Sequence, residues 1–303
     1  MIVIMKDTNE ITREYFERFV VEQRLIDSFV ADTSMELFGK TFASPIMLPA
    51  FSHMKSMGEG RENGLIEYSK AAEKLNVVNW IGMIENEEFQ EILNVNSSTI
   101  RIVKPYADKD KIFSQLRYAA DNGALAVGMD IDHIFGLNGY DVCAGELMDK
   151  QSLEDIKAYV EYTDLPFVIK GVLSVQDALK CAEAGVKAIV VSHHHGRLPG
   201  ALPPIMILPE IKKALADSGI KIFVDCGIAT GSDAFKCICL GADAVSVGRA
   251  FRPALYENGI EGVVSYISKM NDELRYMMSF TGIRDVNEFT SDVLWDLNTL
   301  KRQ

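Results

Sequence analysis

The sequence predicts one domain, a (β/α)8 barrel, for a chain of 303 residues. Short apolar runs alternate with longer amphipathic stretches, which is typical of βαβ units. The runs are nearly continuous in Val, Ile and Ala, as expected for parallel strands covered on both faces. Eight such units most naturally close into a barrel. The runs are residues 42–51, 77–83, 99–106, 124–132, 166–172, 188–195, 221–228 and 244–251.

Helical patterns follow five of these runs, with apolar residues three and four positions apart. The patterns are GLIEYSKAAEKLN, NEEFQEIL, KDKIFSQLRYAADNGA, SVQDALKCAEAGV and SDAFKCICLGA, after the first, second, third, fifth and seventh runs. A doubly wound open sheet is the competing architecture, but it usually has fewer strands and a glycine fingerprint after its first strand. The first run ends in LPAFSHM, without that fingerprint.

The two ends of the chain lie outside the predicted barrel, which takes residues 41–282. Residues 1–40 precede it, and TREYFERFVVEQRLIDSFV predicts one or two helices that cap the bottom of the barrel. Residues 283–303 predict a tail with a short helix or coil.

Composition and charge disfavour several classes of partner. The net charge of −12 argues against nucleic acids and anionic membranes, because both attract a basic surface. No apolar run reaches the roughly 18 residues of a membrane span, and the start MIVIMKDTNE does not resemble a secretory signal. The five cysteines form no CxxC pair, so neither a disulfide framework nor a zinc site is expected. We therefore predict a cytoplasmic protein with reduced thiols.

Polar residues gather where the predicted strands end, which is where barrel enzymes place their chemistry. A lysine inside the run FVIKGV is costly to bury without a partner. Polar residues at the ends of six runs are hard to explain by packing alone, and they predict one active site. They are Lys104 and Tyr106, Asp130 and Asp132, Lys170, His193, His194, His195 and Arg197, Asp225 and Gly227, and Gly248 and Arg249.

The last two runs carry a second signal. DCGIATGSDAF places Gly227 and Gly231 just before a helix that begins near Ser232 and Asp233, and VGRAF follows one unit later. Barrels often bind phosphate with the loops after strands seven and eight, through glycine N–H groups and a helix N-terminus. Arg249 would add a charged fork. Turns need glycine in any case, but glycines and an arginine together predict a phosphate-bearing ligand.

Three of the chain's five histidines are adjacent, in SHHHGR at the end of the sixth run. Because side chains alternate along a strand, His194 is expected to point opposite to His193 and His195. This alternation, and the lack of an obvious carboxylate–histidine arrangement nearby, predict that no metal is bound. One interpretation gives two histidines packing or hydrogen-bonding roles and the third no role. The other makes one histidine a general base, with Asp130 as its orienter and Arg197 as an anion clamp.

Three motifs in this half of the chain match those of one enzyme family. Residues 192–197 read SHHHGR where the family has Ser-Asn-His-Gly-Gly-Arg, residues 168–172 read VIKGV as in the family, and residues 224–251 match its VDGGI and G-D-FKAL-LGA block. The chain thus resembles the FMN-dependent α-hydroxy acid oxidases and dehydrogenases, such as glycolate oxidase and lactate oxidase, from about residue 10 to 282. The resemblance implies an FMN enzyme that oxidises a small 2-hydroxy acid to the 2-oxo acid, and an assembly of four or more subunits.

The resemblance also assigns roles to individual residues. His194 is implied to take the hydroxyl proton, while the α-hydrogen leaves as hydride to flavin N5 or as a proton in a carbanion route. Asp130 would support this histidine and stabilise its imidazolium, and Arg197 would grip the substrate carboxylate. Tyr106 matches an active-site tyrosine. Lys170 matches the lysine beside flavin N1 and O2, where it offsets negative charge on the reduced flavin.

A further set of positions matches flavin contacts. Lys104 stands where the family has a glutamine near the flavin pyrimidine, and Gly128 stands where it has a threonine. Lys104 and Lys170 together would favour the anionic reduced flavin; the alternative for Lys104 is a solvated side chain at the strand mouth. The other implied contacts are Pro49, Ala50, Phe51, Gly82, Ser192, Asp225, Gly227, Gly248 and Arg249.

The chain departs from the family at several positions. The family's second substrate arginine is absent from DIDHIFGLNGYD, so His133, His195 or Lys104 replaces it, or the substrate is not a simple 2-hydroxy acid. Ala229 stands in place of an arginine, which weakens the phosphate grip, and His195 stands in place of a glycine. The stretch between the fourth and fifth runs is short for a substrate lid, which predicts a more open site.

Two other functions remain open at this point. One is a flavin enzyme without net redox chemistry, like the FMN-dependent isopentenyl diphosphate isomerases, which share the barrel and the phosphate site. The pair of His194 and Arg197 disfavours it, whereas the missing second arginine favours it. The other is a phosphate-binding barrel that has lost the chemistry, and Ala229 is its best support.

Overall fold

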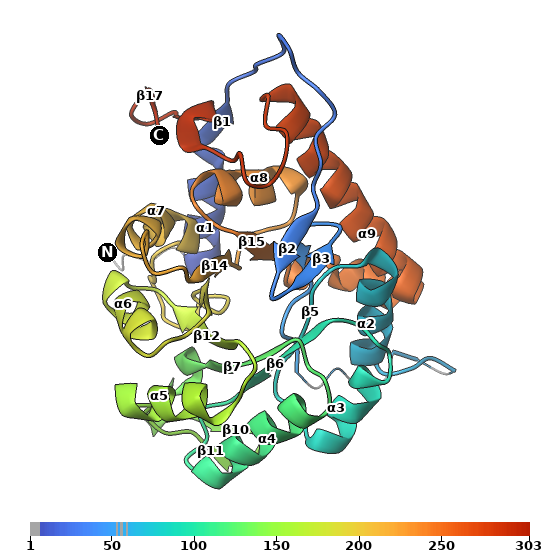
Figure 1. Cartoon of the computed structure of the whole chain (residues 1–303), viewed down its shortest axis with the longest axis vertical. Helices are drawn as coiled ribbons and strands as arrows, with labels where there is room; N and C mark the ends of the chain where they lie inside the picture. Colours follow the sequence, from blue (N-terminus) through green and yellow to red (C-terminus); the bar gives the residue numbers. More distant parts are fainter. Residues whose placement is uncertain (1–6, 53, 55–56, 59) are drawn as a thin grey trace, which may run out of the picture.

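The computed structural model describes residues 7–52, 54, 57–58 and 60–303. Figure 1 shows its central strands surrounded by helices. Eight parallel strands form one sheet in the order β4-β15-β14-β13-β12-β7-β6-β5. Their bounds are β4 Ile46–Met47, β5 Asn79–Ile81, β6 Thr99–Val103, β7 Ala126–Asp130, β12 Phe167–Val172, β13 Ala188–Val191, β14 Lys221–Val224 and β15 Ala244–Ser246.

The two edges of this sheet meet just beyond β4 and β5. Phe51 and Ile81 form an isolated parallel bridge. On one side of it the Leu48 amide donates to the Val78 carbonyl at 3.0 Å. On the other side the Gly82 amide donates to the carbonyl of Phe51 at 2.8 Å. The strands therefore close on themselves, and the predicted (β/α)8 barrel is confirmed.

A helix follows each strand of the barrel. The five helices predicted from the sequence are present as α2, α3, α4, α6 and α8, and α5, α7 and α9 complete the ring. Ser152, Ser174 and Thr230 start three of these helices, because each side chain accepts a hydrogen bond from the amide three residues later. The bounds are α2 Gly64–Leu75, α3 Asn86–Leu93, α4 Lys109–Asp121, α5 Leu153–Tyr162, α6 Val175–Glu183, α7 Pro204–Ala214, α8 Gly231–Cys239 and α9 Arg252–Phe280.

The barrel encloses an apolar cluster of its own, separate from the core between strands and helices. Trp80 and Phe223 meet in this cluster edge to face, with ring centroids 5.7 Å apart. A hairpin of β2 Met35–Leu37 and β3 Lys40–Phe42 adds three apolar side chains to it. The hairpin also hydrogen-bonds residues that precede β5 and β6. It therefore closes the amino-terminal end of the barrel and leaves the carboxyl end for a site.

The prediction of N-terminal helices capping the bottom is only half right. α1 spans Thr8–Glu17, but the next residues form β1 Phe19–Val21, which pairs antiparallel with β16 Leu294–Asp296. The β-branched residues of β1 favour a strand, and a distant part of the chain supplies the partner. The position of α1 also differs from the prediction. It lies against the carboxyl ends of the barrel strands, where Thr12 Oγ1 lies 2.9 Å from His193 Nε2.

The C-terminal tail, predicted as a short helix or coil, forms one helical turn and two strands. The turn η3 Ser291–Val293 leads into β16, and β17 Lys301–Arg302 pairs with β16. The result is a three-stranded sheet in the order β1-β16-β17, and Figure 1 shows it at one end of the molecule. The barrel strands β4, β5 and β15 are equally short but lie in longer apolar runs, whereas β16 and β17 do not, so the sequence carries no recognisable strand pattern for them.

Residues 134–148, which we call the strap, form two short hairpins between the turn η1 Ile131–His133 and α5. The strap ends beside the loop after β6, where the Ala107 amide donates to the Leu147 carbonyl at 2.9 Å. The hairpins are β8 Phe135–Gly136 with β9 Gly139–Tyr140, and β10 Val142–Cys143 with β11 Glu146–Leu147.

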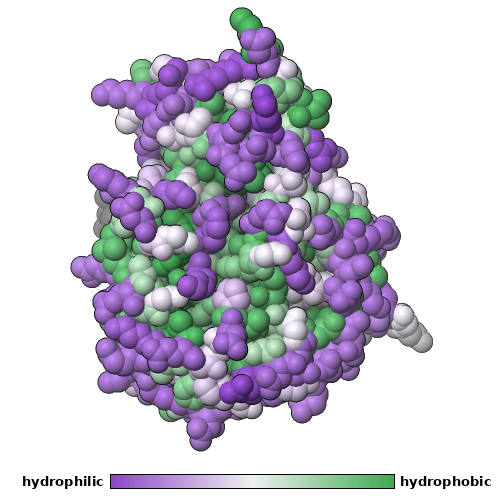
Figure 2. Space-filling model, viewed as in Figure 1, coloured by the Kyte–Doolittle hydropathy of each residue, from purple (hydrophilic) through white to green (hydrophobic). Residues whose placement is uncertain are grey.

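The surface agrees with the amphipathic patterns of the helices. Figure 2 shows hydrophilic side chains around the rim of the molecule, and a mixture of hydrophilic and hydrophobic ones across its middle. Within the described part of the chain, none of the helices combines the length and the hydropathy needed to cross a membrane.

Candidate functional site

A cavity of about 450 Å³ opens at the carboxyl ends of β12 to β15, next to the loop after β4. A larger cavity of about 890 Å³ lies near β2 and the C-terminal tail, but none of the predicted site residues lines it. The smaller one gathers nine of them, so the structure brings most of the predicted flavin contacts around one space. They are Pro49, Ala50, Phe51, Lys170, His194, Asp225, Gly227, Gly248 and Arg249.

The wall of this cavity suits an anionic, phosphate-bearing group. Arg13, Arg249 and Arg252 line it together with Gly227 and Gly248. Gly227 has a φ of +77°, which favours glycine. A Cβ at this position would lie 2.8 Å from a side chain of α1, so the absence of a side chain allows α1 to pack closely. At Gly248 a Cβ would meet no described atom within 4 Å, so ligand atoms can approach its backbone. Guanidinium groups and open backbone are the donors that phosphate prefers.

The start of α8 differs from the prediction that its N–H groups bind phosphate. The amides of residues 229–231 donate to carboxylates of the chain, the first two to Asp233 at 3.0 Å and the third to Glu273 at 2.9 Å. Arg13 lies beside them, with its Nη2 donating to Asp233 Oδ1 at 2.7 Å. Arg13 therefore brings a guanidinium to the part of the cavity wall where Ala229 supplies none.

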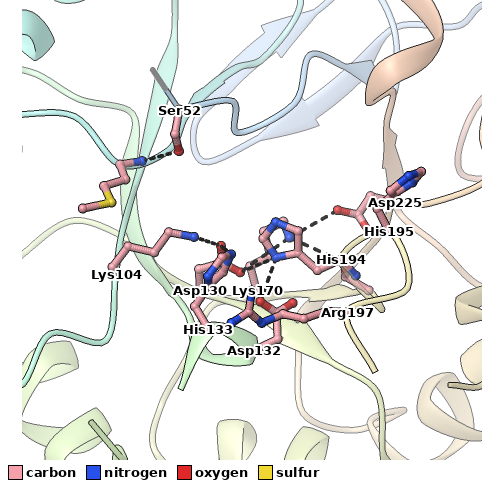
Figure 3. Close-up of polar contacts among 12 residues, drawn as sticks. Ser52, Lys104, Asp130, Asp132, His133, Lys170, His194, His195, Arg197 and Asp225 are labelled. Atoms are coloured by element: carbon pink, nitrogen blue, oxygen red, sulfur yellow. Dashed lines mark hydrogen bonds and ion pairs between the residues drawn. The ribbon is translucent and has the colours of Figure 1, made fainter. Parts of the chain in front are cut away.

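Figure 3 shows a network of buried charges at the carboxyl ends of β6, β7 and β12. Lys104 Nζ lies 2.6 Å from Asp130 Oδ2, and its side chain is only 7% exposed, so the solvated alternative for Lys104 is wrong. Lys170 Nζ lies 3.5 Å from Asp130 Oδ1 and 3.5 Å from Asp225 Oδ2. Burial opposes ionisation of Asp130, but the two ammonium groups hold its pKa well below the usual range. Burial likewise lowers the pKa of Lys170, and its two carboxylate partners raise it well above the usual value.

His194 lies between the cavity and a second carboxylate. Its Nδ1 donates to Asp132 Oδ1 at 2.7 Å, whereas Asp130 Oδ1 is 3.5 Å away. Asp132, rather than the predicted Asp130, is thus the nearer orienting group. Burial and Lys170 lower the pKa of His194, but the two carboxylates outweigh them and raise it. Because Nδ1 holds its proton against a carboxylate, Nε2 is the nitrogen that can accept another.

The three adjacent histidines do not continue the strand. β13 ends at Val191, and His194 and His195 have φ values of +46° and +59°. The alternation that predicted opposite directions therefore does not apply. His193 takes a hydrogen-bonding role, because the Gly196 amide donates to its Nδ1 at 3.0 Å and its Nε2 faces a hydroxyl of α1. His195 lines the cavity, where burial and a nearby arginine lower its pKa.

Arg197 reaches the same cluster but already holds a carboxylate of the chain. Its Nη2 donates to Asp141 of the strap and, at 2.9 Å, to the carbonyl of Phe135. Burial works to raise the pKa of Asp141, but hydrogen bonds from Cys143 and Arg197 bring it below the usual value. The predicted carboxylate clamp is therefore occupied from within the protein.

None of the three residues named as alternatives for the missing arginine, His133, His195 and Lys104, supplies a free cation. The ring of His133 lies 4.6 Å from that of His194, and burial together with Lys104 lowers the pKa of His133 to about 3. His133 is therefore neutral near pH 7. Lys104 is paired with Asp130, and the pKa of His195 is lowered. A second cationic grip on a substrate carboxylate is not found among these three.

A carboxylate–histidine arrangement exists here that the sequence did not reveal. Asp130, Asp132, His133 and His194 bring possible ligand atoms within 4.8 Å of one another. Two lysines already contact Asp130, and their charges oppose a divalent cation at this point. Internal ion pairing therefore explains the arrangement.

Tyr106 and Ser192 are among the predicted residues that do not line the cavity. The Tyr106 side chain is buried against α4, with Lys111 Nζ 4.9 Å from its ring centre, so it does not join the cluster as an active-site tyrosine. Burial raises its pKa. Ser192 is buried behind the site, where its Oγ accepts hydrogen bonds from the His194 amide at 3.0 Å and from Lys170 Nζ at 3.5 Å. Its role is to support these two residues.

Close packing explains two of the predicted glycines, against a side chain at Gly82 and against backbone at Gly128. A Cβ at Gly82 would lie 2.4 Å from Ser52 Oγ, and one at Gly128 would lie 2.1 Å from the carbonyl oxygen of Val168. Gly82 thus supports the wall formed by the loop after β4, and Gly128 allows β7 to approach β12. Neither lines the cavity.

The sequence did not assign roles to Arg13, Asp132 and Asp141. Asp132 follows Asp130 at a spacing of two, and this repeated carboxylate at a strand end was an available signal. Asp141 is 56 residues from Arg197, and Arg13 is 220 residues from Asp233. Contacts at such separations leave no local pattern.

Comparisons with known proteins agree with this geometry. The family described as FMN-dependent dehydrogenase matches residues 5–142 and 136–296. An L-lactate dehydrogenase (cytochrome) of Wickerhamomyces anomalus is 28% identical over 92% of this chain, which spans 54% of that relative's length. A 2-hydroxyacid oxidase of Dictyostelium discoideum is 24% identical over 92% of this chain and 80% of its own. The solved structure of a mandelate oxidase variant with the monooxide FMN adduct has a TM-score of 0.84 and 30% identity, and the match covers 93% of this chain and 89% of that one.

Proposed function

Because the chain belongs to the FMN-dependent dehydrogenase family, we propose that it is a flavin oxidoreductase that oxidises a small 2-hydroxy acid, such as lactate or glycolate, to the 2-oxo acid. The observation that carries this proposal is the position of His194. It lines the cavity, and Asp132 holds its Nδ1 at 2.7 Å. An imidazole held in this way keeps its other nitrogen free to take a proton from an alcohol.

The residues of the cavity wall fit FMN. Arg13, Arg249 and Arg252 are suited to its phosphate, and Lys170 is suited to negative charge on its ring. When bound, FMN supplies the acceptor for the two electrons that leave the substrate carbon.

The remaining chemistry belongs to side chains of this protein. Nε2 of His194 accepts the proton of the substrate hydroxyl. Asp132 and Asp130 stabilise the imidazolium that results, because both carboxylates lie within 3.5 Å of Nδ1. Arg197 is assigned to the substrate carboxylate, beside the base. Lys170 stays protonated between its two carboxylate partners.

An anaerobic titration tests this proposal. Lactate, glycolate and mandelate are added to the FMN-loaded protein, and loss of the flavin absorbance band is followed in a stopped-flow instrument. At least one acid is expected to bleach the flavin, and His194→Ala is expected to slow the bleaching by roughly 10²- to 10⁴-fold. Bound flavin that none of a broad panel of 2-hydroxy acids bleaches would contradict the proposal.

We extend the proposal to assembly and compartment on the ground of the family alone. The protein is expected to act in the cytoplasm as a homo-oligomer of four or more subunits. Light scattering of the purified FMN-loaded protein measures the mass directly, and a monomer of 33.7 kDa would contradict the assembly.

A further inference from the structure

The residue assigned to the substrate carboxylate is already bound to a carboxylate. Nη2 of Arg197 donates to Asp141 Oδ2 and to the carbonyl of Phe135, both in or beside the strap hairpins. Both side chains of the ion pair are largely covered, at 26% and 20% exposed. A guanidinium prefers to bind a carboxylate with two parallel hydrogen bonds. Asp141 engages Nη2, whereas Nε of Arg197 is buried without a hydrogen-bond partner, so a substrate carboxylate that binds Nε and Nη2 together competes with Asp141 for Nη2.

The charges around Arg197 leave no spare cation in this cluster for a substrate anion. Its permanent cations are Lys104, Lys170 and Arg197, and each contacts at least one carboxylate of the chain. Four carboxylates face them, those of Asp130, Asp132, Asp141 and Asp225. His133 is neutral near pH 7 because its pKa is about 3. If Asp141 stayed in place, a substrate carboxylate would add a fifth negative charge to this cluster.

Asp141 sits where it can leave Arg197 at modest cost. It joins the two hairpins of the strap, since its amide donates to the Ile134 carbonyl at 3.0 Å and its carbonyl accepts from the Met148 amide at 2.8 Å. Most apolar side chains of the strap lie at the surface, because Phe135, Leu137, Tyr140, Val142 and Leu147 are between 45% and 103% exposed. Met148 at its C-terminal end is buried and anchors that end in the core. Segments with few buried apolar contacts move at low free-energy cost.

We infer that Asp141 is a specificity-determining residue, an internal carboxylate that occupies Arg197 until the carboxylate of a 2-hydroxy acid displaces it and moves the strap. The inference rests on the proposed function for the identity of the substrate. Free Arg197 is then a minor state. The apparent Kd of any substrate carboxylate equals its intrinsic Kd divided by the fraction of time that Asp141 is away from Arg197, so the smaller this fraction, the weaker the binding. A neutral 2-hydroxy amide gains less from Arg197, so its affinity depends little on Asp141.

The alternative is that Asp141 only holds Arg197 in position for the substrate. The two accounts predict opposite changes when the negative charge of Asp141 is removed. If Asp141 competes, acids bind more tightly to the variant. If it positions Arg197, acids bind more weakly.

The experiment compares the FMN-loaded wild type with Asp141→Asn and with Glu146→Gln. Glu146 is a matched control, because it lies on the same strap, carries the same charge and pairs with Lys111 at 3.0 Å rather than with Arg197. Steady-state kinetics are measured with two acid and amide pairs, lactate with lactamide and mandelate with mandelamide. Retained FMN content and circular dichroism show that each variant is folded.

We expect Asp141→Asn to lower the KM for lactate and mandelate by about tenfold or more, and to change the KM for the amides by less than about threefold. Glu146→Gln should leave all four values near those of the wild type. An unchanged or higher KM for the acids in Asp141→Asn would overturn the inference.

A binding measurement separates this inference from the proposed function. Pyruvate and benzoate have a carboxylate but no 2-hydroxyl group, and their Kd is read from the change they cause in the flavin absorbance. A Kd that falls about tenfold in Asp141→Asn, in a protein that no 2-hydroxy acid bleaches, would keep the inference and remove the proposed function. Bleaching by 2-hydroxy acids with an unchanged Kd would do the reverse.

If Asp141→Asn does not fold, hydrogen exchange of residues 134–148 in the wild type tests the inference instead. Saturating pyruvate should accelerate this exchange, and an unchanged rate would refute the inference.

Discussion

The two sides of His194 are built differently. On the side proposed to hold FMN, called here the cofactor side, arginines and glycines line an open cavity of about 450 Å³ at the ends of β12 to β15. On the side proposed to hold the substrate, called here the substrate side, charged groups are paired with one another at the ends of β6 and β7 and under the strap. The cofactor side is also where the sequence motifs predicted most of the lining residues, although they missed Arg13 and misassigned the start of α8. The substrate side contains most of the other residues that were misassigned or missed.

This difference shows what a motif can and cannot predict. A glycine or a cavity-lining arginine contributes through its own type and place in the strand-end loop, so each position is readable alone. A paired charge contributes only together with its partner. The motifs predicted Asp130 as the orienting partner of His194, but the nearer carboxylate is that of Asp132. Asp130 is still present at its motif position, yet the orienting role has passed to another residue.

The largest effect is expected from breaking the buried pair on the substrate side. Lys104→Met removes the nearest partner of Asp130, whose side chain is 4% exposed, and leaves a buried carboxylate with weaker compensation. Removing one member of a buried ion pair typically costs about 3 kcal/mol or more. The free energy of unfolding of the FMN-loaded protein in urea measures this loss.

Lys157→Met is the control for that comparison. Lys157 pairs with Glu183 at 2.9 Å, but both side chains are well exposed, at 36% and 59%. Exposed pairs contribute about 1 kcal/mol or less. Equal losses in the two variants would mean that the substrate side is not a buried charge network, and the contrast between the two sides would fail.

A second prediction concerns which carboxylate serves His194. Asp132→Asn removes the hydrogen-bonded carboxylate at 2.7 Å and should slow flavin reduction by between about tenfold and a hundredfold. The carboxylates raise the pKa of His194, and the proposed reaction uses its neutral form, so activity should rise as pH rises through this pKa. In Asp132→Asn the pKa falls, and the rise in activity should move to lower pH.

The pH profile distinguishes this role from a merely structural one. Glu146→Gln removes a strap carboxylate that does not touch His194, so its midpoint should match that of the wild type. A slower Asp132→Asn with an unmoved midpoint would return the orienting role to Asp130.

Much of the barrel was predictable because each strand and helix is encoded by its own stretch of sequence. The eight apolar runs all contain strands, and the cavity-lining residues follow from where those strands end. β1 and β16 were not predictable, because each pairs with a strand at the other end of the chain, and β17 is a two-residue strand that pairs with β16. The left-handed φ of His194 and His195 was likewise invisible to an argument that extended β13 through them.

The same limit explains why the contacts on the substrate side were not predicted from the sequence. Asp141 and Arg197 meet through a strap whose hairpins have little periodicity, and the sequence alone predicted only that the lid was short. Tyr106 matched a motif position, but its ring packs against α4 beside Lys111. The sequence predicted correctly that Tyr106 follows the third barrel strand, but it could not predict that its side chain points toward α4.

The smallest effect is expected on the cofactor side, where Arg13 is the one cavity arginine that comes from outside the barrel. Its guanidinium lines the cavity near Ala229 and also pairs with Asp233, so part of its charge is already neutralised. Arg13→Gln keeps a hydrogen-bond donor for Asp233 but removes the charge, and we expect the Kd for FMN to rise by about three- to tenfold, equivalent to about 0.7–1.4 kcal/mol. Quenching of FMN fluorescence on titration with the apoprotein measures this Kd.

Arg275→Gln is the control, because Arg275 pairs with Asp272 on the surface of α9 and does not line the cavity. If Arg13→Gln binds FMN as tightly as this control, α1 only covers the cavity, and the cofactor side is built from the barrel loops alone, as the motifs by themselves predict.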